Sequence, residues 1–190
     1  MSEAVSALAD ARSSGIVEVT EAGLHGMITI RGDLNVADFA NAVTGVAGCD
    51  LPDARKVTRS DSDAILWMSP DELMLHCPHD EAEARIHALA GALKNQHHLI
   101  ANVSDARAQF TLSGDGAAIR EVLAKISPAD LRASKLPVGE IRRTRIAQVA
   151  GAFWFETEDR AQLICFRSVA QYVFDLLEKS SASGSSVGYF

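Results

Sequence analysis

Two stretches with the same plan decide the fold: "LWMSPDELML" at Leu66–Leu75 and "AFWFETEDRAQLICF" at Ala152–Phe166. Each has an apolar run that contains a Trp, a short break rich in Asp and Glu, and a second apolar run. The break suits a turn, because Pro70 presets φ and acidic side chains keep the turn in water. Each stretch therefore predicts a β-hairpin, with Trp67 or Trp154 on the strand that enters the turn. The large apolar area of each ring needs a neighbouring helix to cover it.

The residues that precede the hairpins recur as well. "GMITIRGD" at 26–33 and "AQFTLSGD" at 108–115 are alternating strands that end in the same Gly-Asp turn, about 82 positions apart. Apolar residues at helical spacing follow each turn, and a second helical pattern closes each copy. The sequence therefore predicts an internal duplication. The matched residues are Val36, Phe39, Ala40 and Val43 with Ile119, Val122, Leu123 and Ile126; Trp67 with Trp154; and Ala82, Ile86 and Leu89 with Val169, Val173 and Leu176.

These patterns predict an α+β fold built from two β-α-β-β-α halves, at about residues 16–95 and 97–178. A hairpin alone is marginal, but two halves can share one core, so we expect a single domain over residues 1–190. The ends, residues 1–14 and 179–190, are rich in Ser and Gly and lack apolar periodicity. We expect both ends to be loose.

The composition is that of an ordinary soluble protein, with 47% hydrophobic and 23% charged residues among 190. A net charge of −7 argues against a general nucleic-acid binder, and the short basic run Arg142, Arg143 and Arg145 is interpreted as one face of a strand. No stretch approaches the roughly 20 apolar residues that span a membrane, and the N-terminus is acidic where a secretory signal is basic. The sequence therefore predicts a cytoplasmic protein with neither nucleic acid nor membrane as a partner.

The three cysteines, Cys49, Cys77 and Cys165, form neither a disulfide framework nor a zinc pattern. In "HCPHD", His76 and Cys77 point to opposite faces of an extended strand, so a buried Cys77 is favoured over a metal site with His79. Cys165 lies at nearly the same position of the second half, which also favours core packing. The acidic run "SDSD" at 60–63 is interpreted as a surface turn, because an EF-hand needs a longer acidic series.

Gly114 and Gly116 in "SGDGAAIR" lie between a strand and a helix, as in a dinucleotide-binding loop. The third Gly of that loop is missing, so a tight turn is favoured. Asp33 and Asp115 are then expected to cap the two helices that follow the turns.

Three further sets of polar residues are candidate sites. His97 and His98 precede the apolar run "LIANV" as at any strand entry, and Ser104 lacks the Gly pattern of a nucleophile elbow. Asp105 and Arg107 share a face of an extended chain, which predicts an ion pair between them, with an interface or ligand contact as the alternative. No catalytic, cofactor-binding or metal-binding residue is therefore assigned.

The series "GMITIRGD", "LWMSPDELML", "VSDARAQFTLSG", "EVLAKISPADL" and "CFRSVAQYVFDLL" resembles the gamma subunit of heterotetrameric sarcosine oxidase, from about Gly26 to Leu177. The most specific parts are the hairpin with Trp67, the "VSDAR" stretch and "RSVAQYVFDLL". The resemblance implies a fold like the folate-binding domain of glycine-cleavage aminomethyltransferase.

The same resemblance implies a non-catalytic subunit bound to larger alpha, beta and delta subunits. Those partners are expected to hold FAD, FMN, NAD, tetrahydrofolate and zinc, with no cofactor in this chain. The assembly is expected to demethylate sarcosine oxidatively to glycine, to transfer the one-carbon unit to tetrahydrofolate and to release hydrogen peroxide. "RTRIAQVAGAFWFETED" lacks the Asn, Gly-Gly and Asp-Asp of the aminomethyltransferase, and the one matching acid, Asp105, does not make a folate site. The alternatives are a stand-alone folate-binding or one-carbon transfer protein on this fold, and a homodimeric scaffold.

Overall fold

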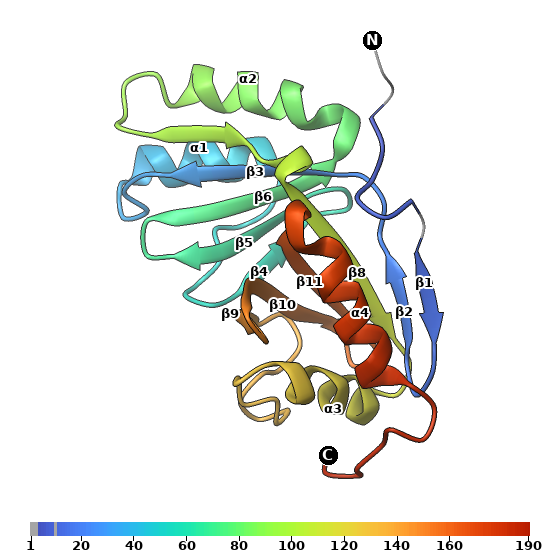
Figure 1. Ribbon diagram of the computed structural model, residues 1–190. Helices are drawn as coiled ribbons and strands as arrows, with labels where there is room; N and C mark the ends of the chain where they lie inside the picture. Colours follow the sequence, from blue (N-terminus) through green and yellow to red (C-terminus); the bar gives the residue numbers. More distant parts are fainter. Residues whose placement is uncertain (1–3, 10) are drawn as a thin grey trace. The chain divides into compact units, whose positions relative to one another are not determined.

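The computed structural model describes residues 4–9 and 11–190, which fold into two compact units (Figure 1). The central unit consists of Leu24–Asp105. The terminal unit combines the described residues up to Gly23 with Ala106–Phe190. Each unit contains an antiparallel sheet and two α-helices, so the predicted α+β class is confirmed.

The central unit has a five-stranded sheet in the order β4-β5-β6-β3-β7. Helices α1 and α2 contact each other, and their apolar residues share one core with the sheet. The elements, in chain order, are β3 (His25–Arg31), α1 (Ala37–Ala47), β4 (Val57–Arg59), β5 (Ala64–Ser69), β6 (Glu72–Pro78), the 3-10 helix η1 (His79–Glu81), α2 (Ala82–Ala92) and β7 (Leu99–Asn102).

The terminal unit has a six-stranded sheet in the order β1-β2-β8-β11-β10-β9. Its helices α3 and α4 also contact each other and share a core with their sheet. The elements are β1 (Arg12–Ser14), β2 (Glu18–Glu21), β8 (Arg107–Ser113), α3 (Gly116–Ile126), β9 (Ile141–Ile146), β10 (Val149–Thr157), β11 (Arg160–Phe166), η3 (Arg167–Val169) and α4 (Ala170–Ser181). The 3-10 helix η2 (Ser104–Ala106) contains the boundary between the two units, with Ser104 and Asp105 in the central unit. The basic run at 142–145 lies on a strand, β9, as predicted, but it does not form one face: Arg143 and Arg145 share a face and are exposed, while Arg142 points to the other face.

The duplication is visible in the order of the elements. β3, α1, β4, β5, β6 and α2 of the central unit correspond to β8, α3, β9, β10, β11 and α4 of the terminal unit. Each copy has one strand more than predicted, because a short strand, β4 or β9, pairs with the first strand of the hairpin. The repeated motif is therefore β-α-β-β-β-α.

Two strands are exchanged between the copies. β2 comes directly before β3 in the chain but pairs with β8, while β7 comes directly before β8 but pairs with β3. The predicted halves at 16–95 and 97–178 put each of these strands with the copy that follows it in the chain. The compact units therefore differ from the sequence halves by two strands, and the single domain over residues 1–190 stays a prediction.

Parts of both chain ends are ordered, which differs from the expected loose termini. Residues 12–14 form β1, and α4 continues to Ser181, where the Ser181 carbonyl accepts a hydrogen bond from the Ile16 amide at 2.7 Å. The carboxylate of Glu121 accepts hydrogen bonds from the amides of Val187 and Gly188. Composition misses this order because backbone hydrogen bonds hold these segments. Residues 1–3 and 10 of the expected N-terminal segment lie outside the described residues.

Both predicted hairpins form. The structural alignment of the two copies is shifted by one residue from the sequence alignment that matches Trp67 with Trp154. Trp67 pairs with Leu73 and Phe155 pairs with Ala161, each just before a bulge that precedes the turn. Trp67 therefore corresponds to Phe155. Because side chains alternate between the faces of a strand, Trp154 points to the opposite face from Phe155.

This alignment changes which residues the helices cover. Trp67 packs against the core that contains α1 and α2, as predicted, and Phe155 occupies the matching core of the terminal unit. Trp154 is buried, at 3% exposure, but it is not part of that core, so the expectation that a helix covers its ring is wrong. The same shift places Ala170 and Leu177, rather than Val169 and Leu176, at the buried positions of α4.

The Gly-Asp turns and the hairpins are joined by one repeated hydrogen bond. The amide of Gly32 donates to the carbonyl of Asp71 at 3.1 Å, and the amide of Gly114 donates to the carbonyl of Asp159 at 3.1 Å. In each copy the end of the first strand is thus tied to the turn of the hairpin. The two motifs that the sequence repeats form one structural device.

We expect the replacement Gly32→Ala to lower the free energy of unfolding by about 1–3 kcal/mol, because overpacking displaces buried side chains. A Cβ at residue 32 would lie 2.3 Å from Cε2 of Phe39, which is fully buried. Urea denaturation of the full chain measures the effect. Gly45→Ala in α1 is the matched control: no heavy atom lies within 4 Å of the added Cβ, and better helix propensity should stabilise the chain by about 0.5–1 kcal/mol. Equal effects of the two replacements would contradict the close Gly32–Phe39 contact.

Candidate functional site

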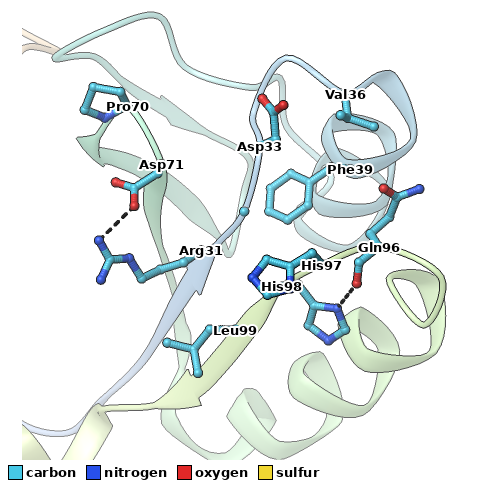
Figure 2. A pocket seen from close by; sticks show the side chains of 11 residues that line it. Arg31, Asp33, Val36, Phe39, Pro70, Asp71, Gln96, His97, His98 and Leu99 are labelled. Carbon is cyan, nitrogen blue, oxygen red and sulfur yellow. Dashed lines mark hydrogen bonds and ion pairs between the residues drawn. The ribbon is translucent and has the colours of Figure 1, made fainter.

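A pocket of about 840 Å³ opens at one end of the sheet in the central unit (Figure 2). Four segments meet there: the end of β3, the start of α1, the turn of the β5–β6 hairpin, and the loop between α2 and β7. The Gly-Asp turn and the hairpin turn that the sequence repeats thus form two of its walls. The lining residues are Arg31, Gly32, Asp33, Val36, Phe39, Pro70, Asp71, Gln96, His97, His98 and Leu99.

An ion pair lies at the solvent-exposed side of the pocket. Nη2 of Arg31 donates to Oδ2 of Asp71 at 2.9 Å, and Figure 2 shows the two side chains extending toward each other. The hydroxyl of Ser69 donates to Asp71 at 2.6 Å. This hydrogen bond lowers the pKa of Asp71, and the charge of Arg31 adds to the effect. The carboxylate is therefore well stabilised in its ionised form.

Two imidazoles and an apolar wall complete the pocket. Nδ1 of His98 donates to the carbonyl of Gln96 at 2.9 Å, which leaves Nε2 as the acceptor of the neutral ring. His97 is exposed, and Phe39 supplies a buried aromatic surface. Leu99 is 51% exposed. An ion pair and two imidazoles beside an apolar surface suit recognition of a polar partner group, and none of the eleven lining residues is a Ser, Thr or Cys nucleophile.

Sequence reasoning treated His97 and His98 only as a strand entry. The structure brings both into the pocket with Arg31 and Asp71, which lie on other elements. The sequence feature that could indicate the pocket is the repeated Gly-Asp turn, because the pocket forms where the copy at Gly32 meets the hairpin turn.

The "HCPHD" stretch has the structural role that was favoured. Cys77 is buried in the helix-facing core, while the ring of its neighbour His76 lies 4.6 Å from the ring of His25. Burial raises the pKa of the Cys77 thiol to about 11 and that of the Cys165 thiol to about 12. Both thiols are therefore protonated at neutral pH, as expected for core residues. Across residues 4–9 and 11–190, no three His, Cys, Asp or Glu side chains are grouped to hold a metal ion.

Asp105 and Arg107 do not have the roles that an extended chain predicts. Asp105 lies in η2, and its carboxylate is 3.7 Å from Nε2 of His79. Arg107 begins β8 and places its guanidinium 4.0 Å from the ring centre of Phe166. The turn of 3-10 helix separates residues that a strand would put on one face. The predicted ion pair between them is therefore wrong.

Ser104 and the two Asp residues of the turns are structural. The buried Ser104 accepts a hydrogen bond from the Met27 amide at 2.9 Å and donates to Asn102 at 2.6 Å, so its hydroxyl links η2 to β3 and β7. Asp115 caps α3, as predicted, by accepting from the Ala118 amide at 3.0 Å. Asp33 instead accepts from the Asn35 amide, because three residues separate it from α1, so its predicted role as a cap is wrong.

Two buried charges were missed by the sequence analysis. Residues 61 and 62 of "SDSD" are exposed, as predicted, but the side chain of Asp63 is only 1% exposed and accepts from Nε of Arg85 at 2.8 Å. In the terminal unit, Arg120 is 4% exposed and donates to two backbone carbonyls. The spacing of charges along the sequence does not indicate which residues Asp63 and Arg120 contact.

Among the described residues, no helix combines the length and the apolar character needed to cross a bilayer.

Comparison with known proteins connects this fold with one family. Residues 31–183 match the family model described as sarcosine oxidase, gamma subunit family. Sarcosine oxidase subunit gamma from Corynebacterium sp. (strain U-96) is 28% identical over 148 residues, which cover 75% of this chain and 70% of that protein. The subunit of the same name from Arthrobacter sp is 27% identical over 150 residues, or 78% and 71% of the two chains.

Solved structures share the fold. A chain of heterotetrameric sarcosine oxidase from Corynebacterium sp. U-96, in complex with pyrrole 2-carboxylate, matches with a TM-score of 0.79 at 24% identity, covering 90% of this chain and 87% of that one. Glycine cleavage system aminomethyltransferase T from Bartonella henselae matches with a TM-score of 0.61 at 16% identity, covering 84% and 44%. The fold predicted from the resemblance is confirmed. With most of its length matched by the family model, this chain belongs to the sarcosine oxidase gamma subunit family.

Proposed function

We propose that this chain is the non-catalytic gamma subunit of a heterotetrameric sarcosine oxidase. The observation that carries the proposal is the family match over residues 31–183, and the fold shared with a chain of such an oxidase supports it. In this role the chain is held by larger alpha, beta and delta subunits in the cytoplasm. A permanently held subunit buries upwards of roughly 2,000 Å² in total.

The assembly would convert sarcosine, oxygen and tetrahydrofolate to glycine, hydrogen peroxide and methylene-tetrahydrofolate. FAD, FMN, NAD, the folate and zinc are assigned to the partner subunits. This chain contributes no reacting group in that scheme. This chain instead contributes a surface that binds the partner subunits. The pocket at Arg31 and His97 is proposed as a point of contact with a polar group of a partner.

Exposed apolar side chains mark further parts of the proposed interface. Phe166 and Tyr172 are large apolar residues that stay exposed at the end of β11 and in the first turn of α4, and Leu99 is exposed at the pocket. The guanidinium of Arg107 lies over the Phe166 ring and fixes its orientation. Trp154 is too deeply buried to take part in this interface.

The test is purification of the assembly from its native host grown on sarcosine. The affinity tag belongs at the N-terminus, because Glu121 binds amides of the C-terminal segment. We expect larger chains to co-purify, together with a flavin spectrum and sarcosine-dependent production of hydrogen peroxide. A colourless chain without partners would refute the proposal. Tyr172→Ala is expected to weaken the retention of the larger chains, whereas Gly45→Ala, on an exposed helix position with open space around it, should not.

The second candidate is a stand-alone folate-binding or one-carbon transfer protein, which the fold shared with aminomethyltransferase T favours. Titration of the isolated chain with tetrahydrofolate separates the two candidates. Stoichiometric binding would support the folate module, and no binding would support the accessory subunit. Light scattering of the same sample tests the homodimeric scaffold by its mass.

A further inference from the structure

A second pocket, of about 420 Å³, lies in the terminal unit at the N-terminus of α3. It is formed by the first turns of α3, the turn of the β10–β11 hairpin, the loop after α3 and the last two residues of the chain. The lining residues are Gly116, Ala117, Arg120, Arg132, Ala133, Glu158, Tyr189 and Phe190. Two arginines in one small pocket are notable in a chain whose net charge is −7.

Arg120 is held rigidly but keeps one donor nitrogen without an acceptor. Nη1 donates to the carbonyls of Leu131 and Leu136 at 2.8 and 2.9 Å, and the guanidinium lies 4.2 Å from the ring centre of Phe155. Nη2 is buried and has no hydrogen-bond acceptor in the described part of the chain. Its nearest acid is Glu158, with Oε2 at 3.6 Å, beyond the distance of a normal hydrogen bond.

Glu158 faces Arg120 as a loose counter-ion. Its side chain is 75% exposed, so it can turn into solvent at little cost, whereas Arg120 is fixed by three contacts. Nη2 faces the Glu158 carboxylate, and both residues line the pocket. An anion that displaced the Glu158 carboxylate would gain the hydrogen bond that Nη2 lacks.

The start of α3 adds backbone donors to the same pocket. α3 has 11 residues, and the Asp115 cap satisfies the Ala118 amide. The two amides before it, at Gly116 and Ala117, have no acceptor within the helix, and the helix dipole favours negative charge there. Gly116 lets the hairpin turn approach closely, since a Cβ at this position would lie 2.3 Å from the Glu158 carbonyl oxygen. Backbone amides and a buried guanidinium are the usual donors for a phosphate group.

We propose that this pocket binds the phosphate group of a small ligand, with Nη2 of Arg120 and the first amides of α3 as donors. Glu158 is the counter-ion that the ligand displaces. The aromatic side chains of Tyr189 and Phe190, whose ring centres are 5.0 Å apart, line the pocket and accommodate an aromatic group attached to the phosphate. Arg132 is already paired with Asp130, which lowers the pKa of that carboxyl to about 2, so Arg132 is not assigned as a donor to the ligand. The inference does not depend on the proposed function.

The test is isothermal titration of the full chain with phenyl phosphate and with inorganic phosphate at constant ionic strength. We expect saturable binding of both, with phenyl phosphate tighter. Glu158→Gln removes the competing carboxylate and should tighten binding by at least about fivefold, since a like charge close to the ligand is lost. Asp159→Asn is the matched control: it changes the net charge equally, but Asp159 does not line the pocket and accepts its hydrogen bond from Thr157. This variant should bind as the unmodified chain does, within about twofold.

Two results would overturn the proposal. One is the absence of saturable binding in both the unmodified chain and Glu158→Gln, with circular dichroism showing that both are folded. The other is an equal gain in Glu158→Gln and Asp159→Asn, which would reduce the effect to overall charge. Tyr189→Ala adds an independent readout, because it should abolish the preference for phenyl phosphate over inorganic phosphate.

Discussion

Replacement of Arg120 by methionine is expected to lower the free energy of unfolding by about 2–6 kcal/mol, because two buried carbonyl oxygens lose their donor at about 1–3 kcal/mol each. The guanidinium is the donor to the carbonyls of Leu131 and Leu136 and stacks on Phe155. Methionine fills part of the volume but leaves two buried carbonyl oxygens without a donor. The loop between α3 and β9 would lose its attachment to the helix. Urea denaturation followed by circular dichroism measures the loss.

The control for Arg120→Met is Glu158→Gln. It removes the charge that faces Arg120, but it does so at a side chain that is largely in solvent. We expect a change within about 0.5 kcal/mol, as for most surface substitutions. A loss as large as that of Arg120→Met would show that the ion pair, rather than the bonds to the loop carbonyls, holds Arg120 in place.

Replacement of Asp63 by alanine is expected to cost about 2–4 kcal/mol in the central unit. The carboxylate accepts hydrogen bonds from Nε and Nη2 of Arg85 at 2.8 and 3.3 Å and from the Ser62 hydroxyl at 2.8 Å. The bond to Asp63 is the main reason why the pKa of Arg85 is raised. Arg85 also pairs with Glu81 at 2.8 Å, which offsets part of the loss. The measurement is again urea denaturation of the full chain.

Asp61→Ala is the matched control for this prediction. Asp61 belongs to the same acidic run but is exposed, so we expect its replacement to change stability by less than about 0.5 kcal/mol. If both alanine variants had the same free energy of unfolding, the ion pair between Asp63, before β5, and Arg85, on α2, would contribute nothing to stability. The comparison thus distinguishes a buried anchor from a solvated turn within four residues of sequence.

Local patterns were sufficient for the hairpins but not for their alignment. The sequence alignment of the two copies makes Trp67 equivalent to Trp154, because each copy carries one Trp before the turn. In the structure the pairing of Phe155 with Ala161 puts Phe155, and not Trp154, at the position of Trp67. A shift of one residue moves a side chain to the other face of the sheet, so residue identity was a poor guide to burial here.

The pocket could be anticipated only in part. The Gly-Asp turn at Gly32 and the hairpin turn at Asp71 were both predicted, and they form two of its walls. The loop that carries His97 and His98 reaches the pocket because β7 pairs with β3, a contact between residues far apart in the chain. No spacing within the loop indicates that pairing. The sequence therefore does not indicate that Arg31 lies near His97 and His98.

The sequence by itself determined the α+β class, the duplication, the burial of Cys77 and Cys165, and membership of the family. Periodicity and turn chemistry act over a few residues, so the chain carries these signals locally. Only the tertiary structure decided the exchange of β2 and β7, the face on which Trp154 lies, and the partners of Asp63 and Arg120. The physical reason is that every residue except proline offers the same backbone donor and acceptor to a sheet. The partner strand, and with it the partner of each buried charge, is therefore selected by packing of the whole fold.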